Sequence, residues 1–203
     1  EQKNGKSIER QARRGFVVGL GIETRKQILQ VDGNASTAGS SVGASLLLGM
    51  KIHRVVLGLW GGIDSLGSTV VLGSASGTSS SSVTTTSFVL GPALQVSLIR
   101  VAAGRFELLG SAQLGFGRRS TSRAADPELP STVATDFPRS TFQLGYQLGP
   151  GLRFYVLRQA AISLTGGLAV DHLFVASDSP SGLRQDSLYS LSLFGTLGAM
   201  GVF

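Results

Sequence analysis

Alternation of large apolar residues with small or polar ones constrains the fold of this chain more than any other feature. In residues 141–154, TFQLGYQLGPGLRF, every second residue from Phe142 to Phe154 is large and apolar except Pro150. The same period of two recurs in residues 41–52 and 87–98, and in segments near 15–26, 55–72, 105–118, 160–175 and 187–203. This period indicates β-strands, about eight in all. Each run lasts about ten residues, which is the length of strand that crosses a bilayer.

The connections between these segments differ in length in a regular way. Short turns near 51–54, 100–105 and 156–160 carry basic residues, namely Lys51, Arg54, Arg100, Arg105 and Arg158. Long polar connections are expected at 31–40, 73–83, 118–140 and 176–187. Short and long connections therefore alternate, which predicts an all-β, up-and-down antiparallel transmembrane barrel with short periplasmic turns and long extracellular loops. An even strand number places both termini on the same side of the membrane, which we expect to be the periplasm, with residues 1–14 as a periplasmic tail and 15–203 as the barrel.

The direction of the apolar face separates two kinds of barrel. A soluble barrel would fill its interior with the apolar residues, whereas a membrane barrel turns them toward lipid. The less apolar face here is rich in glycine, serine and glutamine, which suits the crowded interior of an eight-stranded barrel. Composition agrees, because the chain has 28 glycines and only 15% charged residues. The membrane barrel is therefore favoured, and the soluble barrel is the alternative.

The final residues TLGAMGVF resemble the C-terminal recognition signal of bacterial outer-membrane barrels, through Thr196, Gly198 and the terminal aromatic Phe203. Gly201 departs from that pattern, since a large apolar residue is usual there. The strand number and size resemble eight-stranded barrels of the OmpA/OmpX type. This resemblance covers about 15–203, and it implies a location in the outer membrane of a Gram-negative bacterium and insertion by the barrel assembly machinery.

Alternation also predicts which polar residues face the lumen. A charge on the lipid face at mid-bilayer would cost about 2–4 kcal/mol, so charges within the strands should point inward. The predicted lumen residues are Glu23, Arg25, Lys51, Asp64, Gln95, Gln113, Arg119, Gln143, Gln147 and Asp171, together with an ion pair between Glu107 and Arg153. We expect this pair to plug the periplasmic side of the lumen, and a gate is the alternative.

No catalytic, cofactor-binding or metal-binding residue is predicted. The chain has no cysteine, which excludes disulfides and zinc–thiolate sites. Lipid A deacylases are outer-membrane barrels that use a histidine–serine pair, and His172 has Asp171 beside it and Ser177 nearby. Phe174 occupies the serine position of the H-x-S spacing expected of those enzymes, so a deacylase-like enzyme is an alternative only.

The expected function is a non-enzymatic envelope scaffold or anchor. Arg118, Arg119 and Arg123, at the start of the long third loop, are candidates for contact with lipopolysaccharide phosphates or an envelope protein partner. The net charge is +6, but no aromatic and basic constellation accompanies it, so nucleic acid is not an expected partner. A narrow gated channel is the remaining alternative.

Overall fold

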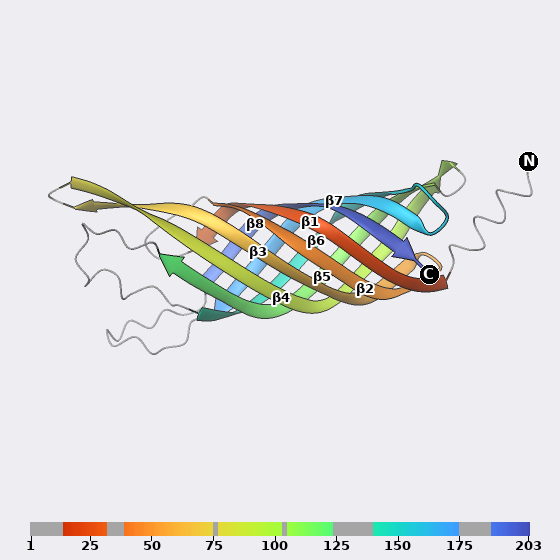
Figure 1. Cartoon of the computed structure of the whole chain (residues 1–203), viewed down its shortest axis with the longest axis horizontal. Coiled ribbons are helices and arrows are strands. Elements are labelled where there is room, and N and C mark those ends of the chain that lie inside the picture. The colour runs from red at the N-terminus through yellow and green to blue at the C-terminus, as the bar shows by residue number, and fades with distance from the viewer. Residues whose placement is uncertain (1–13, 32–38, 75–76, 103–104, 124–139, 175–187) are drawn as a thin grey trace, which may run out of the picture.

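Eight antiparallel strands, in chain order, close into one barrel (Figure 1). The computed structural model describes residues 14–31, 39–74, 77–102, 105–123, 140–174 and 188–203. The strands are β1 (Arg14–Val31), β2 (Ser40–Ile52), β3 (Val55–Ser74), β4 (Gly77–Val101), β5 (Phe106–Arg123), β6 (Ser140–Tyr155), β7 (Ala160–Phe174) and β8 (Leu188–Val202). The predicted all-β, up-and-down barrel is confirmed. No helix among the described residues is long and apolar enough to span a membrane.

The barrel closes where β8 pairs with β1, from Val17 opposite Val202 to Val31 opposite Tyr189. The last rung of this ladder joins Phe16 and Phe203 by two backbone hydrogen bonds, of 2.9 and 2.8 Å. Closure matters because an open sheet would leave unpaired N–H and C=O groups at its edges, which hydrocarbon cannot satisfy.

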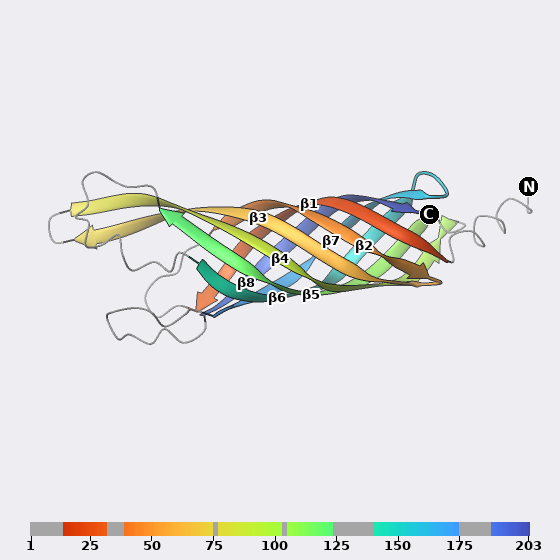
Figure 2. The same ribbon diagram turned by 60° about the horizontal axis from the view of Figure 1, so that its bottom comes forward.

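The two ends of the barrel differ, as Figures 1 and 2 show. We call the end that holds Arg14 and Phe203 the terminal end; the turns after β2, β4 and β6 lie there too. The turn after β2 is tight, since β3 begins three residues after Ile52, and His53 adopts a left-handed φ of 57° within it. We call the opposite end the hairpin end, because β3 and β4 extend there beyond the other strands as a two-stranded hairpin.

That hairpin corrects one prediction. Residues 73–83 were expected to form a loop, yet β3 continues to Ser74 and β4 begins at Gly77, with Gly73 opposite Thr78 and Ser74 opposite Gly77. The polar composition of this segment is typical of a loop. Its many hydroxyl residues, threonines among them, can also continue the strand pairing that begins within the barrel. The predicted loop over 118–140 is also shorter than expected, since β5 runs to Arg123 and β6 begins at Ser140; residues 124–139 lie outside the described residues. The predicted loops over 31–40 and 176–187, and the tail 1–14, lie almost wholly outside the described residues.

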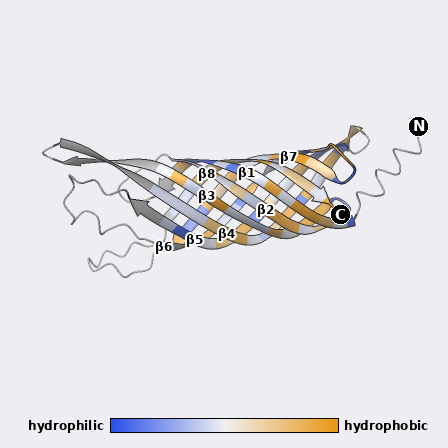
Figure 3. Cartoon of the chain, viewed as in Figure 1, coloured by the Kyte–Doolittle hydropathy of each residue, from blue (hydrophilic) through white to orange (hydrophobic). Residues whose placement is uncertain are grey.

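Large apolar side chains are exposed on the outer wall, between two belts of aromatic residues. Figure 3 shows the hydrophobic positions in orange along the strands. At the terminal end the belt holds Phe16, Phe106, Phe154 and Phe203, and at the hairpin end it holds Phe88, Phe116, Phe142, Phe174 and Tyr189. On β6, Phe142 and Phe154 are twelve residues apart; at about 3.3 Å per residue and a tilt of about 45°, they are separated by about 28 Å along the barrel axis. An apolar band of about 25 Å bounded by aromatic belts is the outer surface of a transmembrane barrel.

Candidate functional site in the barrel lumen

At the terminal end of the lumen, one carboxylate lies among three basic side chains. Glu107 of β5 accepts from Lys51 of β2 at 3.4 Å and from Arg153 of β6 at 3.2 Å, and Arg100 of β4 lies 2.9 Å from it. The Tyr155 hydroxyl donates to Glu107 at 3.4 Å and accepts from Lys51. Lys51, Glu107 and Arg153 are at most 2% exposed. We call these five residues the terminal cluster; it joins four strands across the lumen.

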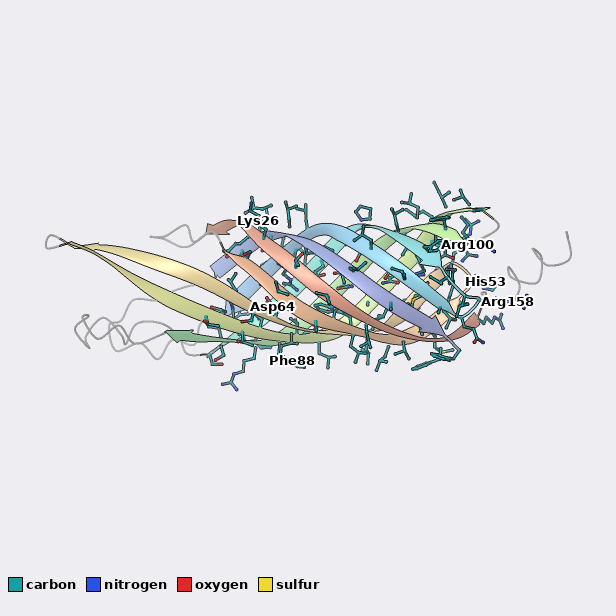
Figure 4. All side chains as sticks on the ribbon, turned by 45° about the horizontal axis from the view of Figure 1, so that its top comes forward. Lys26, His53, Asp64, Phe88, Arg100 and Arg158 are labelled. Carbon is teal, nitrogen blue, oxygen red and sulfur yellow. The ribbon has the colours of Figure 1, made fainter. Side chains whose placement is uncertain are left out.

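Arg100 reaches this cluster because the β4 strand carries an irregularity. The register with β5 shifts between Ser97 and Ile99, so that Leu98 and Ile99 are both exposed on the outer wall. Two successive outward residues reverse the phase of the alternation, and Arg100 then turns inward. Its guanidinium also donates to the backbone oxygen of His53 at 2.8 Å, which places it at the mouth of the lumen (Figure 4).

The charges of the terminal cluster do not balance. Three basic groups surround one carboxylate, so two positive charges are in excess. Arg153 gives one further hydrogen bond to the Gln95 side-chain oxygen, but its Nε has no partner within the described part of the chain. A buried charge without compensation is costly, so Glu107 is the residue on which this arrangement depends.

An apolar layer occupies the middle of the lumen. Trp60 of β3 is 4% exposed and lies with Leu47, Val89 and Ala93 in one buried cluster. A Cβ placed on Gly115 would lie 2.9 Å from the Trp60 ring and 2.6 Å from Val89, so the ring lies directly over the β5 backbone. Along β3, Trp60 lies between Val56, toward the terminal end, and Asp64, toward the hairpin end. The same buried cluster also contains Val56 and Tyr155, so apolar packing continues from Trp60 to the terminal cluster.

The polar region at the hairpin end is better balanced. Arg25 lies 2.5 Å from Glu23 and 3.3 Å from Asp171. Two amides complete the network, because Gln143 donates to Asp171 at 2.9 Å and Gln147 donates to Glu23 at 3.1 Å. We call these five residues the hairpin-end cluster.

A small cavity lies next to the hairpin-end cluster. Asp64 of β3 and Arg119 of β5 line it together with Arg25, Ser41 and Ser87. Its free volume is about 20 Å³, which is enough for roughly one water molecule. The described residues around this cavity therefore leave room for little more than that water.

The structure brings together most of the residues predicted for the lumen. Glu107 pairs with Arg153, and Glu23, Arg25, Gln143, Gln147 and Asp171 form one network; Gln113 is half-buried, and its Oε1 has no partner among the described residues. Among the residues of the C-terminal signal, Thr196 and Gly198 are half-buried and Phe203 is exposed.

The three arginines predicted for loop contact lie in different places. Arg118 is exposed on the outer wall and donates to the Ser140 hydroxyl. Arg119 was predicted both for the lumen and for loop contact; it is half-buried and lines the lumen cavity, as the first of these predictions expected. The side chain of Arg123 lies outside the described part of the chain.

His172 and Asp171 are neighbours in sequence but lie on opposite sides of the wall. Asp171 contacts Arg25 inside, whereas the His172 ring lies on the outer face between the rings of Tyr189 and Tyr146, at centroid distances of 4.1 and 6.1 Å. The two side chains therefore form no catalytic dyad. Ser177 lies outside the described residues, among which no group of three histidine, aspartate or glutamate side chains is placed to hold a metal ion.

Sequence analysis did not predict that Arg100, Trp60 and Tyr155 face the lumen. Two outward apolar residues in succession, Leu98 and Ile99, are the signal that could have located Arg100. For Trp60 the signal was its position in phase with Asp64 on the same strand. Tyr155 is in phase with Arg153, which was already predicted to face inward.

No protein-family model and no curated protein matches the chain. Among solved structures, the outer membrane protein OprG from Pseudomonas aeruginosa is similar at 12% identity and a TM-score of 0.48, over 95% of this chain and 98% of that one. Neisserial surface protein A is similar at 14% identity and a TM-score of 0.48, over 93% and 97% of the two chains. Ail, the attachment invasion locus protein of Yersinia pestis, solved with the heparin analogue sucrose octasulfate, is similar at 11% identity and a TM-score of 0.40, over 92% and 99%. At these values the likeness carries no inference about activity. By its own closed strand order, apolar outer wall and charged interior, the chain is an eight-stranded barrel with the architecture of small outer-membrane proteins.

Proposed function

We propose that this protein is a non-conducting barrel of the bacterial outer membrane that serves as an envelope anchor, with its terminal end in the periplasm. The filling of the lumen is the observation that carries this proposal. Two charged clusters and the apolar layer around Trp60 occupy the interior at successive levels, and eight strands leave room for little besides side chains. A protein with such an interior acts through its surfaces.

The outer wall at the hairpin end supports contact with lipopolysaccharide. Lys26 of β1 and Arg118 of β5 are exposed there, close to the aromatic belt that contains Phe88 and Phe116 (Figure 4 labels Lys26 and Phe88). Basic side chains at that level lie where the phosphates of the outer leaflet would be, and arginine matches phosphate with two parallel hydrogen bonds. An envelope protein that binds the projecting β3–β4 hairpin is a further partner consistent with an anchor.

Two measurements on the purified full chain test the proposal. In planar lipid bilayers, the inserted, heat-modifiable barrel should give no single-channel currents, because the apolar layer interrupts any aqueous path. Retained lipopolysaccharide, measured after extraction from outer membranes, should fall in the K26Q/R118Q variant.

Each measurement has an outcome against the proposal. Steady currents through the wild-type barrel would favour the gated channel, and these currents should then grow when Glu107→Gln breaks the terminal cluster. A chain that stays soluble without detergent would exclude the membrane barrel altogether. If the K26Q/R118Q variant retains as much lipopolysaccharide as wild type, these two residues do not bind it.

A further inference from the structure

The terminal end of the barrel carries a ring of exposed arginines. Arg14 begins β1, and Arg54, Arg105 and Arg158 lie in the turns after β2, β4 and β6. We call these four residues the basic rim. All four are exposed, and Figure 4 shows Arg158, His53 and Arg100 at this end of the barrel, opposite the end that holds Lys26. Every turn at this end therefore presents an arginine to the surroundings of the barrel.

Among the described residues, no acidic side chain forms an ion pair with Arg14, Arg54 or Arg105. Within the described residues only Glu23, Asp64, Glu107 and Asp171 are acidic, and Glu107 alone lies at the terminal end. Glu107 is 2% exposed and already contacts three basic side chains. The two positive charges in excess in the terminal cluster thus add to the potential of the rim, across an interior that screens charge poorly.

Exposed apolar side chains accompany the arginines on the same turns. Val156 and Leu157 precede Arg158 and are 57% and 67% exposed, and Val101 at the end of β4 is 55% exposed. In water such side chains would be unfavourably placed, whereas at the boundary between acyl chains and head groups they are buried. The turns therefore lie at head-group depth, where a long basic side chain extends its charge toward the phosphate layer.

From this arrangement we infer that the basic rim binds the phosphate groups of anionic phospholipids in the leaflet around the terminal end. The inference rests on the proposed membrane function, because it needs an inserted barrel. Guanidinium groups fit phosphate oxygens through two parallel hydrogen bonds, and a ring of four would hold several head groups around the barrel at once. The rim would fix the depth of the barrel in the membrane, and it would select negatively charged lipid over zwitterionic lipid.

The test is lipid selection by the full-length barrel. Wild-type protein is reconstituted in nanodiscs made from an equal mixture of phosphatidylglycerol and phosphatidylethanolamine, and the lipid retained after mild detergent extraction is counted by native mass spectrometry. Phosphatidylglycerol should be enriched, and the enrichment should fall as salt is raised, because exposed charges are screened. In R54Q/R105Q the enrichment should fall by about fivefold for each arginine removed.

The matched control is R54K/R105K, which changes the same two side chains but keeps their positive charge at the terminal end. Enrichment should persist in this control. Equal retention of the two lipids by wild type, or equal loss in both variants, would overturn the inference. If R54Q/R105Q does not fold, R105Q alone and the salt titration of wild type decide the question. A wild-type chain that fails to insert, shown by the absence of a heat-modifiable band, would instead refute the proposed function.

Discussion

Replacing Glu107 by glutamine should be the most damaging conservative change in the lumen. The substitution keeps the size of the side chain and removes the only negative charge in the terminal cluster. Lys51 and Arg153, each at most 2% exposed, would then face one another and Arg100 without a counter-charge. Breaking a buried ion pair by removing one partner costs about 3–5 kcal/mol, because the other charge stays buried and unpaired. We expect Glu107→Gln to lower the free energy of unfolding by this amount.

Arg153→Met should cost less, although it breaks the same ion pair. It removes one of the two excess positive charges while Glu107 keeps Lys51 and Arg100 as partners. The structure therefore predicts an asymmetry, with Glu107→Gln more destabilising than Arg153→Met. In the double variant, the methionine should recover part of the stability that Glu107→Gln loses.

Urea unfolding of the barrel in lipid vesicles measures these effects. Trp60 is the only tryptophan of the chain and lies in the apolar layer, so its fluorescence reports on the lumen directly. The slope of the free energy with urea should stay constant, which would show that the same surface is exposed in each variant.

Glu23→Gln is the control, because it is the same chemical change in the other charged cluster. Arg25 keeps Asp171 at 3.3 Å, so the loss should be about 1–2 kcal/mol. The reasoning fails if Glu107→Gln costs no more than Glu23→Gln, or if Arg153→Met is the more damaging of the two terminal changes.

Two further predictions concern the apolar layer and the closure of the barrel. Gly115→Ala should lower stability by about 1–3 kcal/mol and shift the Trp60 emission, because the new Cβ would lie 2.6 Å from Val89 and 2.9 Å from the ring; Gly67→Ala, with nothing within 4 Å, should do neither. Deleting Phe203 removes two backbone hydrogen bonds to Phe16, whereas Phe203→Ala keeps them, so only the deletion should weaken the heat-resistant band on unheated gels. An equally weakened band in both variants would show that the aromatic ring, and not the pair of backbone hydrogen bonds, stabilises the closure.

The strands and their inward residues could be predicted because each strand has one face against lipid and one against a packed lumen. A shift of one residue would turn every side chain to the wrong side, so the period of two carries strong information. Glu107 and Arg153 are directly opposite each other on adjacent strands, which made their pairing predictable from neighbouring segments.

Contacts across the lumen could not be predicted in the same way. Lys51 reaches Glu107 from β2, and no ladder joins β2 to β5, so their meeting depends on the stagger of all the intervening strands. Arg100 was missed because one extra residue at Leu98 reverses the alternation locally. The hairpin pairing within residues 73–83 was missed because composition alone does not distinguish a ladder of hydroxyl residues from a loop.

The buried charges also restrict how the barrel can enter a membrane. A β5–β6 hairpin inserted alone would present Glu107 and Arg153 to hydrocarbon, and β1 and β7 would do the same with Arg25 and Asp171. Each such exposure costs up to about 2–4 kcal/mol at the middle of the bilayer, and unpaired strand edges add to it. Stepwise insertion of single hairpins is therefore uphill until β8 meets β1. The strands must curl toward one another while they cross, so that each charge passes through the membrane already enclosed by its neighbours.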